Sequence, residues 1–291
     1  MKPPVFDYVS PGSVEEAIAA LGAEGAEETK VLAGGQSLVP LLNLRLAQPA
    51  RIVDLNGIES LTRITLADGS LTVGALVRQR AAERSSEVRT ACPLMAQAIP
   101  LIGHSAIRNR GTVGGSIAHA DSAAELPTVV VCLDAELVAQ GPGGTRVIPA
   151  ADFFTGFFST ALSEDEVLTA VRVAAAGPHT GSAYEEVARR HGDFAMVGVA
   201  AVVRLDGDTV ADARIAVSGV GATPVRARAA EAGLIGGTAT EDLFAVAAAS
   251  ASAGIAPTSD LHASAAYRRH LCGVLVNRAL RTATSRAREG R

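Results

Sequence analysis

The chain has 291 residues, 48% of them hydrophobic, and its 26 basic and 30 acidic residues give a net charge of −4. This length favours two domains, and the mildly negative charge with 3% aromatic residues argues against a nucleic-acid-binding protein. No apolar run approaches the ~20 residues of a membrane helix, and Met1 to Ser10 lacks a signal-peptide core, so we expect no transmembrane segment.

The first elements form a small α/β unit. Ser13-Val-Glu-Glu16 is a capping box that predicts a helix through Leu21. A strand is expected over 30–33, where it runs into paired glycines, and Ser37 can cap the following turn. A second strand is expected over 51–55, and a hairpin over 64–74 with its turn at Asp68-Gly69.

Helical and extended stretches then alternate. Helices are expected over 78–84 and 87–102, a glycine-rich segment over 110–125, and strands over 128–133, 136–139 and 167–173. The run 177–181 breaks the pattern and predicts a linker. Beyond it, strands over 195–205 and 213–219 precede helices over 225–234, 240–253 and from Asp260 onward. We therefore predict an α+β protein with domains 1–176 and 177–291, the first divided into subdomains 1–57 and 58–176.

Two glycine-rich segments are candidates for binding a ligand. In Val31-Leu-Ala-Gly-Gly-Gln-Ser-Leu38 a strand ends on two glycines, and successive backbone amides in such a turn can form an anion nest. Arg110-Gly-Thr-Val-Gly-Gly-Ser-Ile-Ala-His119 repeats the paired glycines between two hydroxyl side chains, which can donate to phosphate. Either segment alone could be an empty tight turn, but two in one domain indicate a dinucleotide.

The sequence carries no pattern typical of other nucleotide, catalytic or metal sites. The chain has no G-x-G-x-x-G, P-loop or G-x-S-x-G pattern, so no Rossmann fingerprint and no catalytic residue is predicted. Cys92, Cys132 and Cys272 stand far apart, and an iron–sulfur cluster needs about four thiolates. We expect neither a cluster, a disulfide scaffold nor a metal site, and we expect a cytoplasmic protein. His104 and His119 have no carboxylate partner at metal spacing.

The two segments resemble a known family. Ala33-Gly-Gly-Gln-Ser-Leu-Val-Pro40 and Thr112-Val-Gly-Gly-Ser-Ile-Ala-His-Ala-Asp-Ser-Ala-Ala-Glu-Leu-Pro127 are similar to the FAD-binding loops of the medium subunits of carbon monoxide dehydrogenase and related molybdenum hydroxylases. The flavin domain of xanthine dehydrogenase has related segments. The resemblance covers nearly the whole chain. It implies FAD bound by two α/β subdomains of the para-cresol methylhydroxylase and vanillyl-alcohol oxidase type, followed by a C-terminal α+β domain of antiparallel sheet and helices.

The resemblance also implies site residues. Residues 31–38 and 112–116 would hold the diphosphate and the adjoining ribityl chain, and His119 and Glu125 would reach the nucleotide. Ile102 and Leu168 would make apolar and main-chain contacts to the cofactor, with Leu168 near the flavin ring, and Phe194 would lie beside the isoalloxazine. The implied cofactor-binding residues are Val31, Leu32, Ala33, Gly34, Gly35, Gln36, Ser37, Leu38, Ile102, Thr112, Val113, Gly114, Gly115, Ser116, His119, Glu125, Leu168 and Phe194. Two positions depart from the pattern. Ser116 replaces a common Asn or Asp, and Glu185 stands where xanthine dehydrogenase has a lysine, which puts the use of NAD in doubt.

The family resemblance implies a role within a complex. A large molybdopterin subunit would oxidise the substrate, and a small [2Fe–2S] subunit would relay electrons to FAD, in a dimer of heterotrimers. FAD would pass the electrons to an external acceptor. Two alternatives stay open: a stand-alone flavin oxidoreductase, such as a peptidoglycan-precursor reductase, and a non-catalytic nucleotide-binding protein. Neither the substrate nor the acceptor can be read from this chain.

Overall fold

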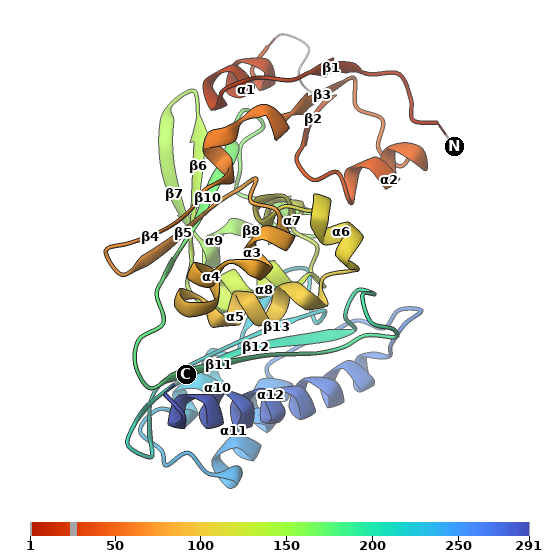
Figure 1. Ribbon diagram of the computed structural model, residues 1–291. Coiled ribbons are helices and arrows are strands. Elements are labelled where there is room, and N and C mark those ends of the chain that lie inside the picture. Colours follow the sequence, from red (N-terminus) through yellow and green to blue (C-terminus); the bar gives the residue numbers. More distant parts are fainter. Residues whose placement is uncertain (1, 24–27, 291) are drawn as a thin grey trace.

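Three main sheets follow one another from the N-terminal to the C-terminal end of the molecule (Figure 1). This computed structural model describes residues 2–23 and 28–290. The sheets have three, five and four strands, and a two-stranded ribbon lies beside the middle one. The α+β class predicted from the sequence is confirmed.

The first unit is a parallel sheet in the order β1-β3-β2. Its elements are β1 (Asp7–Val9), α1 (Val14–Leu21), β2 (Thr29–Leu32), α2 (Leu38–Asn43) and β3 (Arg51–Asp54). Helix α1 begins where the capping box predicts, because the Ser13 hydroxyl accepts from the Glu16 amide at 3.1 Å. Leu32 and Asp54 are paired in register, so the segments that follow both strands leave the sheet side by side.

The second unit is an antiparallel sheet covered by helices. Its strands, in the order β4-β5-β10-β6-β7, are β4 (Ile64–Ala67), β5 (Ser70–Gly74), β10 (Val167–Ala174), β6 (Glu136–Gly141) and β7 (Gly144–Pro149). Its helices are α3 (Gln79–Arg84), α4 (Ser86–Ala91), α5 (Pro93–Ala98), α6 (Ser105–Arg110), α7 (Val113–His119), α8 (Glu125–Cys132) and α9 (Ala150–Phe153), with 3-10 turns at Leu55–Gly57, Glu59–Thr62 and Ile99–Leu101. The ribbon pairs β8 (Phe154–Gly156) with β9 (Ser159–Thr160).

The C-terminal unit is a four-stranded antiparallel sheet with helices on its outer face (Figure 1). Its elements are β11 (Thr180–Val187), β12 (Val197–Asp206), β13 (Thr209–Ser218), β14 (Val225–Arg226), α10 (Arg228–Leu234), α11 (Glu241–Ala253) and α12 (Ala265–Arg288). Valine and alanine fill β12, and its residues from Val197 to Val203 are all buried. Such a strand is covered on both faces.

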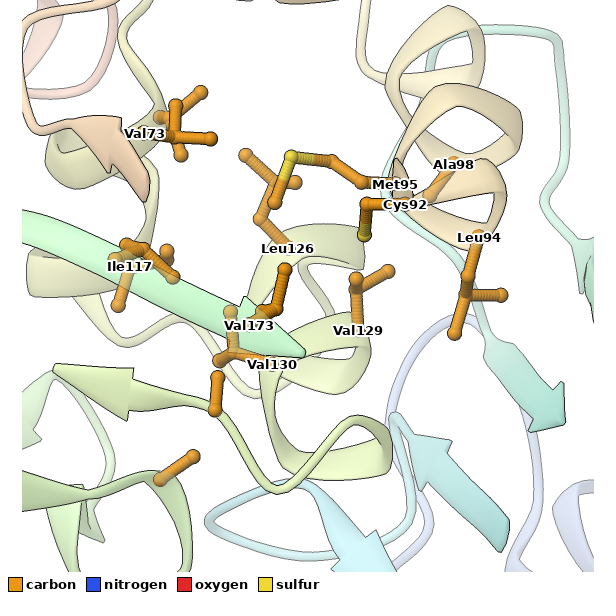
Figure 2. Close-up of a cluster of buried hydrophobic side chains, with 14 of the residues drawn as sticks. Val73, Cys92, Leu94, Met95, Ala98, Ile117, Leu126, Val129, Val130 and Val173 are labelled. Carbon is orange, nitrogen blue, oxygen red and sulfur yellow. The ribbon is translucent and has the colours of Figure 1, made fainter. Parts of the chain in front are cut away.

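The main core joins the second unit to the C-terminal sheet. Figure 2 shows Met95 of α5, Leu126 and Val129 of α8 and Val173 of β10 packed together. The same cluster includes Tyr184, Ala200, Val202 and Ala216 from the C-terminal sheet. The inner face of that sheet therefore completes the core of the unit before it, and the two units pack as one body.

One predicted strand is wrong. Residues 128–133 lie mostly in helix α8, not in a strand. Every residue of this helix from Glu125 to Cys132 is buried, so its sequence carries no amphipathic period. The valine run was therefore indistinguishable from a buried strand by periodicity.

Other elements differ in their bounds. The predicted helix over 87–102 is divided into α4, α5 and a 3-10 turn, because Pro93 and Pro100 each lack an amide donor. The last helix begins at Ala265, where Ser264 caps it, instead of at Asp260. The stretch predicted as a helix from Val225 begins with β14, and β1, β7 and β11 were not predicted.

Candidate cofactor site

The first glycine-rich segment is a turn with free amides. It leaves β2 at the carboxyl edge of the parallel sheet and leads into α2, and Gly35 adopts a positive φ of 74°. The amides of Gly35, Gln36 and Ser37 donate to no acceptor in the described residues. The predicted cap is wrong, because the Ser37 hydroxyl accepts no hydrogen bond from the helix amides. Both the amides and this hydroxyl are therefore free to bind an anion.

The second segment is a helix N-terminus. Gly114 and Gly115 lie in the first turn of α7, and Thr112 caps it by accepting from the Gly115 amide at 3.0 Å. The Val113 and Gly114 amides donate to Val77 and Ala75, and the Ser116 amide to Thr112. The Val113, Gly114, Gly115 and Ser116 amides are therefore already bonded within the chain. In this segment, the Ser116 hydroxyl and the positive end of the α7 dipole are the groups that could still bind an anion.

The two segments nevertheless lie against each other. A Cβ atom added to Gly34 would come within 2.5 Å of the Arg110 carbonyl oxygen, and one added to Gly115 within 3.3 Å of the Ala33 Cβ. Only glycine at position 34 allows this approach. The first sheet and helix α7 thus form the two sides of one site.

A polar network fixes their relative position. The Asn56 amide group donates to the Ala33 carbonyl oxygen at 2.8 Å, and Arg78 donates to Asn56 Oδ1 at 2.7 Å and also to the Arg110 carbonyl oxygen. Burial lowers the pKa of Arg78, and the Arg110 charge adds to this. The sequence analysis did not predict this network, whose local signal is limited to Asp54 at the end of β3 and Asn56 two residues later.

The remaining predicted residues extend from this site toward the C-terminal unit. His119 ends α7, with its ring centroid 5.0 Å from that of Phe158, and burial lowers its pKa. Glu125 begins α8, and burial, followed by the nearby Glu186, raises its pKa to about 8. Ile102 is partly buried, and its carbonyl oxygen accepts from Arg108 at 3.0 Å.

Leu168 and Phe194 occupy different settings. Leu168 is 5% exposed at an irregularity of β10, and the adjacent Thr169 carbonyl oxygen accepts from the Ala75 amide below α7. Phe194 is 63% exposed in the loop between β11 and β12. A Cβ on Gly192 in that loop would lie 2.9 Å from the Gly103 carbonyl oxygen, so the loop covers the segment after Ile102. A pocket of about 600 Å³ opens beside Phe194, and no sequence signal indicated it.

Comparison with known proteins decides the family. Residues 4–175 match the FAD binding domain in molybdopterin dehydrogenase, and residues 182–283 match the CO dehydrogenase flavoprotein C-terminal domain. The chain belongs to the FAD-binding medium subunits of the molybdenum hydroxylases. The resemblance stated from the two glycine-rich segments is thus confirmed, and FAD is the cofactor of this family.

Relatives match this medium subunit over nearly its whole length. The 6-hydroxypseudooxynicotine dehydrogenase complex subunit alpha of Paenarthrobacter nicotinovorans is 42% identical, over 99% of this chain and 97% of its own. The carbon monoxide dehydrogenase of Hydrogenophaga pseudoflava that lacks the Mo-pyranopterin moiety superposes with a TM-score of 0.96 at 42% identity, covering 98% and 99% of the two chains. Quinoline 2-oxidoreductase of Pseudomonas putida 86 superposes with a TM-score of 0.94 at 36% identity, covering 99% of each chain.

The free groups of the medium subunit fit FAD. A diphosphate needs several donors that approach closely, and the unbonded Gly35–Ser37 amides and the Ser116 hydroxyl are donors that would suit it. In the described ranges, 2–23 and 28–290, no cluster of histidine, cysteine or acidic side chains could hold a metal ion. None of the helices in these ranges is long and apolar enough to cross a membrane.

Proposed function

We propose that this medium subunit takes electrons from the [2Fe–2S] clusters of a partner subunit and passes them to an external acceptor. The observation that carries the proposal is the pairing of the free-amide turn at Gly35–Ser37 with the N-terminus of α7, held together by Asn56 and Arg78. FAD suits the role because it accepts electrons singly and delivers them in pairs. The backbone amides and side chains of this chain bind and orient the cofactor, and no side chain is assigned as a catalytic acid or base.

The cofactor-binding residues are part of this proposal. The turn amides and the Ser37 and Ser116 hydroxyls hold the diphosphate, while the backbone of Val31 to Ala33 supports the turn. Leu168 and Phe194 lie beside the flavin ring, Ile102 makes an apolar contact to the cofactor, and His119 and Glu125 lie beside the nucleotide. The full proposed set is the segment 31–38, the segment 112–116, and these five residues. The domain division is proposed as 1–176 and 177–291, with subdomains 1–57 and 58–176.

The partners proposed are a large molybdopterin subunit and a small [2Fe–2S] subunit, assembled as a dimer of heterotrimers. One relative is named as a subunit of a complex, and the three relatives are named for three different substrates. This variety agrees with substrate choice on another subunit. Cys92, Cys132 and Cys272 are buried free thiols, which agrees with the proposed cytoplasmic location.

Gly35→Ala tests the cofactor site. An alanine at position 35 would have to keep the φ of 74°, and its Cβ would come within 3.1 Å of the Val39 side chain. The substitution should therefore disturb the turn. Left-handed backbone costs a non-glycine residue about 1–2 kcal/mol. We expect the purified variant to keep its fold and lose most of its FAD, measured as the ratio of flavin to protein absorbance.

Gly69→Ala is the matched control. Gly69 has a φ of 71° in the β4–β5 turn, where an added Cβ meets nothing within 4 Å. The Gly69→Ala variant carries a similar backbone strain outside the proposed site, so it should retain FAD. Full FAD content in Gly35→Ala would contradict the site.

Electron transfer is tested separately by co-purifying the natural complex and following bleaching of the flavin absorbance after substrate is added. An unchanged flavin spectrum in a complex with reduced clusters would contradict the electron-transfer role.

A further inference from the structure

The tip of the β8–β9 ribbon carries two exposed phenylalanines. Gly156 and Ser159 pair in register, so Phe157 and Phe158 form the two-residue turn between them. Their exposed fractions are 63% and 61%. A single apolar side chain at the surface is ordinary. Two adjacent aromatic rings at one tip are unusual in a chain whose residues are only 3% aromatic.

Phe158 adopts a left-handed backbone conformation. Its φ is 51°, a region that glycine and asparagine enter readily and that is sterically costly for a bulky residue. Glycine is the usual residue at a turn position that requires a positive φ. Such strain persists only where the surrounding structure holds the residue in place, and it is concentrated at functional sites. The turn therefore keeps a phenylalanine at a position whose backbone favours glycine.

Contacts with the end of α7 hold the strained residue in place. The Phe158 amide donates to the Ala120 carbonyl oxygen at 3.2 Å. Ala120 is itself left-handed, with a φ of 52°, because it is the C-cap of α7. Within the ribbon, the hydroxyl oxygens of Thr155 and Ser159 lie 2.9 Å apart and join its two sides. The ribbon is thus anchored to the helix end, and its tip has one position.

The anchored tip places the Phe158 ring against His119. The two ring centroids are 5.0 Å apart and the ring planes are inclined by 38°. Within residues 2–23 and 28–290, neither ring nitrogen of His119 has a hydrogen-bond or ion-pair partner. The imidazole is therefore oriented by an aromatic neighbour, while both of its nitrogens are free for a ligand.

His119 lies on the same side of α7 as Ser116, because residues three positions apart in a helix are neighbours on one face. A ligand bound along this face therefore meets both side chains. Burial lowers the pKa of His119, and the nearby Asp121 acts in the opposite direction. A neutral imidazole offers one N–H donor and one acceptor nitrogen. A hydroxyl group, which both donates and accepts, is the matching partner on a nucleotide.

We infer that Phe158 is a positioning residue, whose ring holds the His119 imidazole in one orientation toward a hydroxyl group of bound FAD. The inference rests on the proposed function, which places His119 beside the nucleotide. The ring contact explains why the turn keeps a phenylalanine at a position that otherwise suits glycine. A glycine there would relieve the backbone and leave the imidazole free to change rotamer.

Phe158→Gly tests the positioning in the full chain. In histidine-labelled protein without FAD, NMR coupling constants should report one His119 rotamer in wild type and averaged rotamers in the variant. Fluorescence titration with FAD should show binding about tenfold weaker than wild type. Phe158→Tyr keeps the ring and should retain both wild-type results. Phe157→Leu, on the same tip, is the control and should also retain them, because the recorded ring contact to His119 is made by Phe158.

A double-mutant cycle shows whether Phe158 acts through His119. His119→Ala should weaken FAD binding, and Phe158→Gly added to it should cause no further loss. Unchanged affinity in His119→Ala, or additive losses in the double variant, would overturn the inference. Unchanged His119 rotamers in Phe158→Gly, in a chain that binds FAD, would overturn it as well. A wild-type chain that takes up no FAD, yet loses its single His119 rotamer in Phe158→Gly, would contradict the proposed cofactor role alone.

Discussion

Burial changes the acid–base behaviour of Glu125, a residue predicted to contact the nucleotide. The sequence placed it in a Glu-Leu-Pro run after the second glycine segment, and the structure makes it the first residue of α8 with 5% exposure. An acidic residue in the first turn suits the helix dipole. Burial and Glu186 oppose its ionisation more strongly, and its pKa rises to about 8.

The pH dependence of stability follows from this shift. In the unfolded chain Glu125 has its ordinary pKa of 4.5, whereas in the folded chain it is about 8. The folded state therefore binds the extra proton, so its stabilising contribution is complete below pH 4.5 and is lost as the pH rises to 8. We expect the free energy of unfolding to fall across this window by roughly 1.4 kcal/mol for each unit of separation, measured by urea denaturation of the cofactor-free chain.

Glu125→Gln should flatten this dependence, because its neutral amide does not titrate. Glu186→Gln should flatten it less, since the folded pKa of Glu186 is lower, at about 7. Glu185→Gln should leave the slope as in wild type. A wild-type chain equally stable at pH 5 and pH 8 would show that neither carboxyl is held protonated by the fold.

At the scale of elements, the sequence predicted the helices and strands whose apolar residues recur with a clear helical or alternating period. Helix α1, the β4–β5 hairpin and the paired strands β12 and β13 were found from capping, alternation and turn residues. Helix α8 was not, because burial on all sides removes the period. The glycine segments were found as patterns, but only tertiary contacts show that the second is a helix N-terminus whose amides are already bonded.

Other parts of the candidate site had no local sequence signal. Arg78 and Asn56 join the two glycine segments although 22 positions separate them. Glu186 raises the pKa of Glu125 although it lies on β11, a strand that was not predicted. Contacts of this kind depend on how elements pack, and a single sequence does not encode them by spacing.

The packing of α12 on β11 provides a prediction about an element. A Cβ on Gly181 would lie 1.9 Å from the Ala283 carbonyl oxygen and 2.5 Å from the Ala287 amide nitrogen, both backbone atoms that cannot rotate away. Gly181→Ala should push the helix off the strand and lower the free energy of unfolding by about 1–3 kcal/mol. Thermal denaturation measures this. Gly143→Ala, with nothing within 4 Å, is the control and should change little. An unchanged melting temperature in Gly181→Ala would contradict the described helix–strand contact.

At the scale of the whole molecule, the FAD-binding half and the C-terminal sheet share structure on both sides of their boundary. The main core takes side chains from both halves. Arg226 of β14 reaches across to donate to Asp134 at 2.6 Å and to the Val131 carbonyl oxygen at 3.1 Å, while also pairing with Glu231 of its own half. We therefore expect the two halves to unfold together.

Binding of FAD should then stabilise both halves at once. A ligand that binds only the folded chain adds about 2.7 kcal/mol when its free concentration is 100 times its dissociation constant. For a chain of this size, each kcal/mol raises the melting temperature by roughly 2–4 °C, so saturating FAD should raise it by roughly 5–10 °C. Calorimetry should show a single transition that moves as a whole. Gly69→Ala should keep the shift and Gly35→Ala should lose most of it. Two transitions, of which only one responds to FAD, would show that the shared core does not couple the halves.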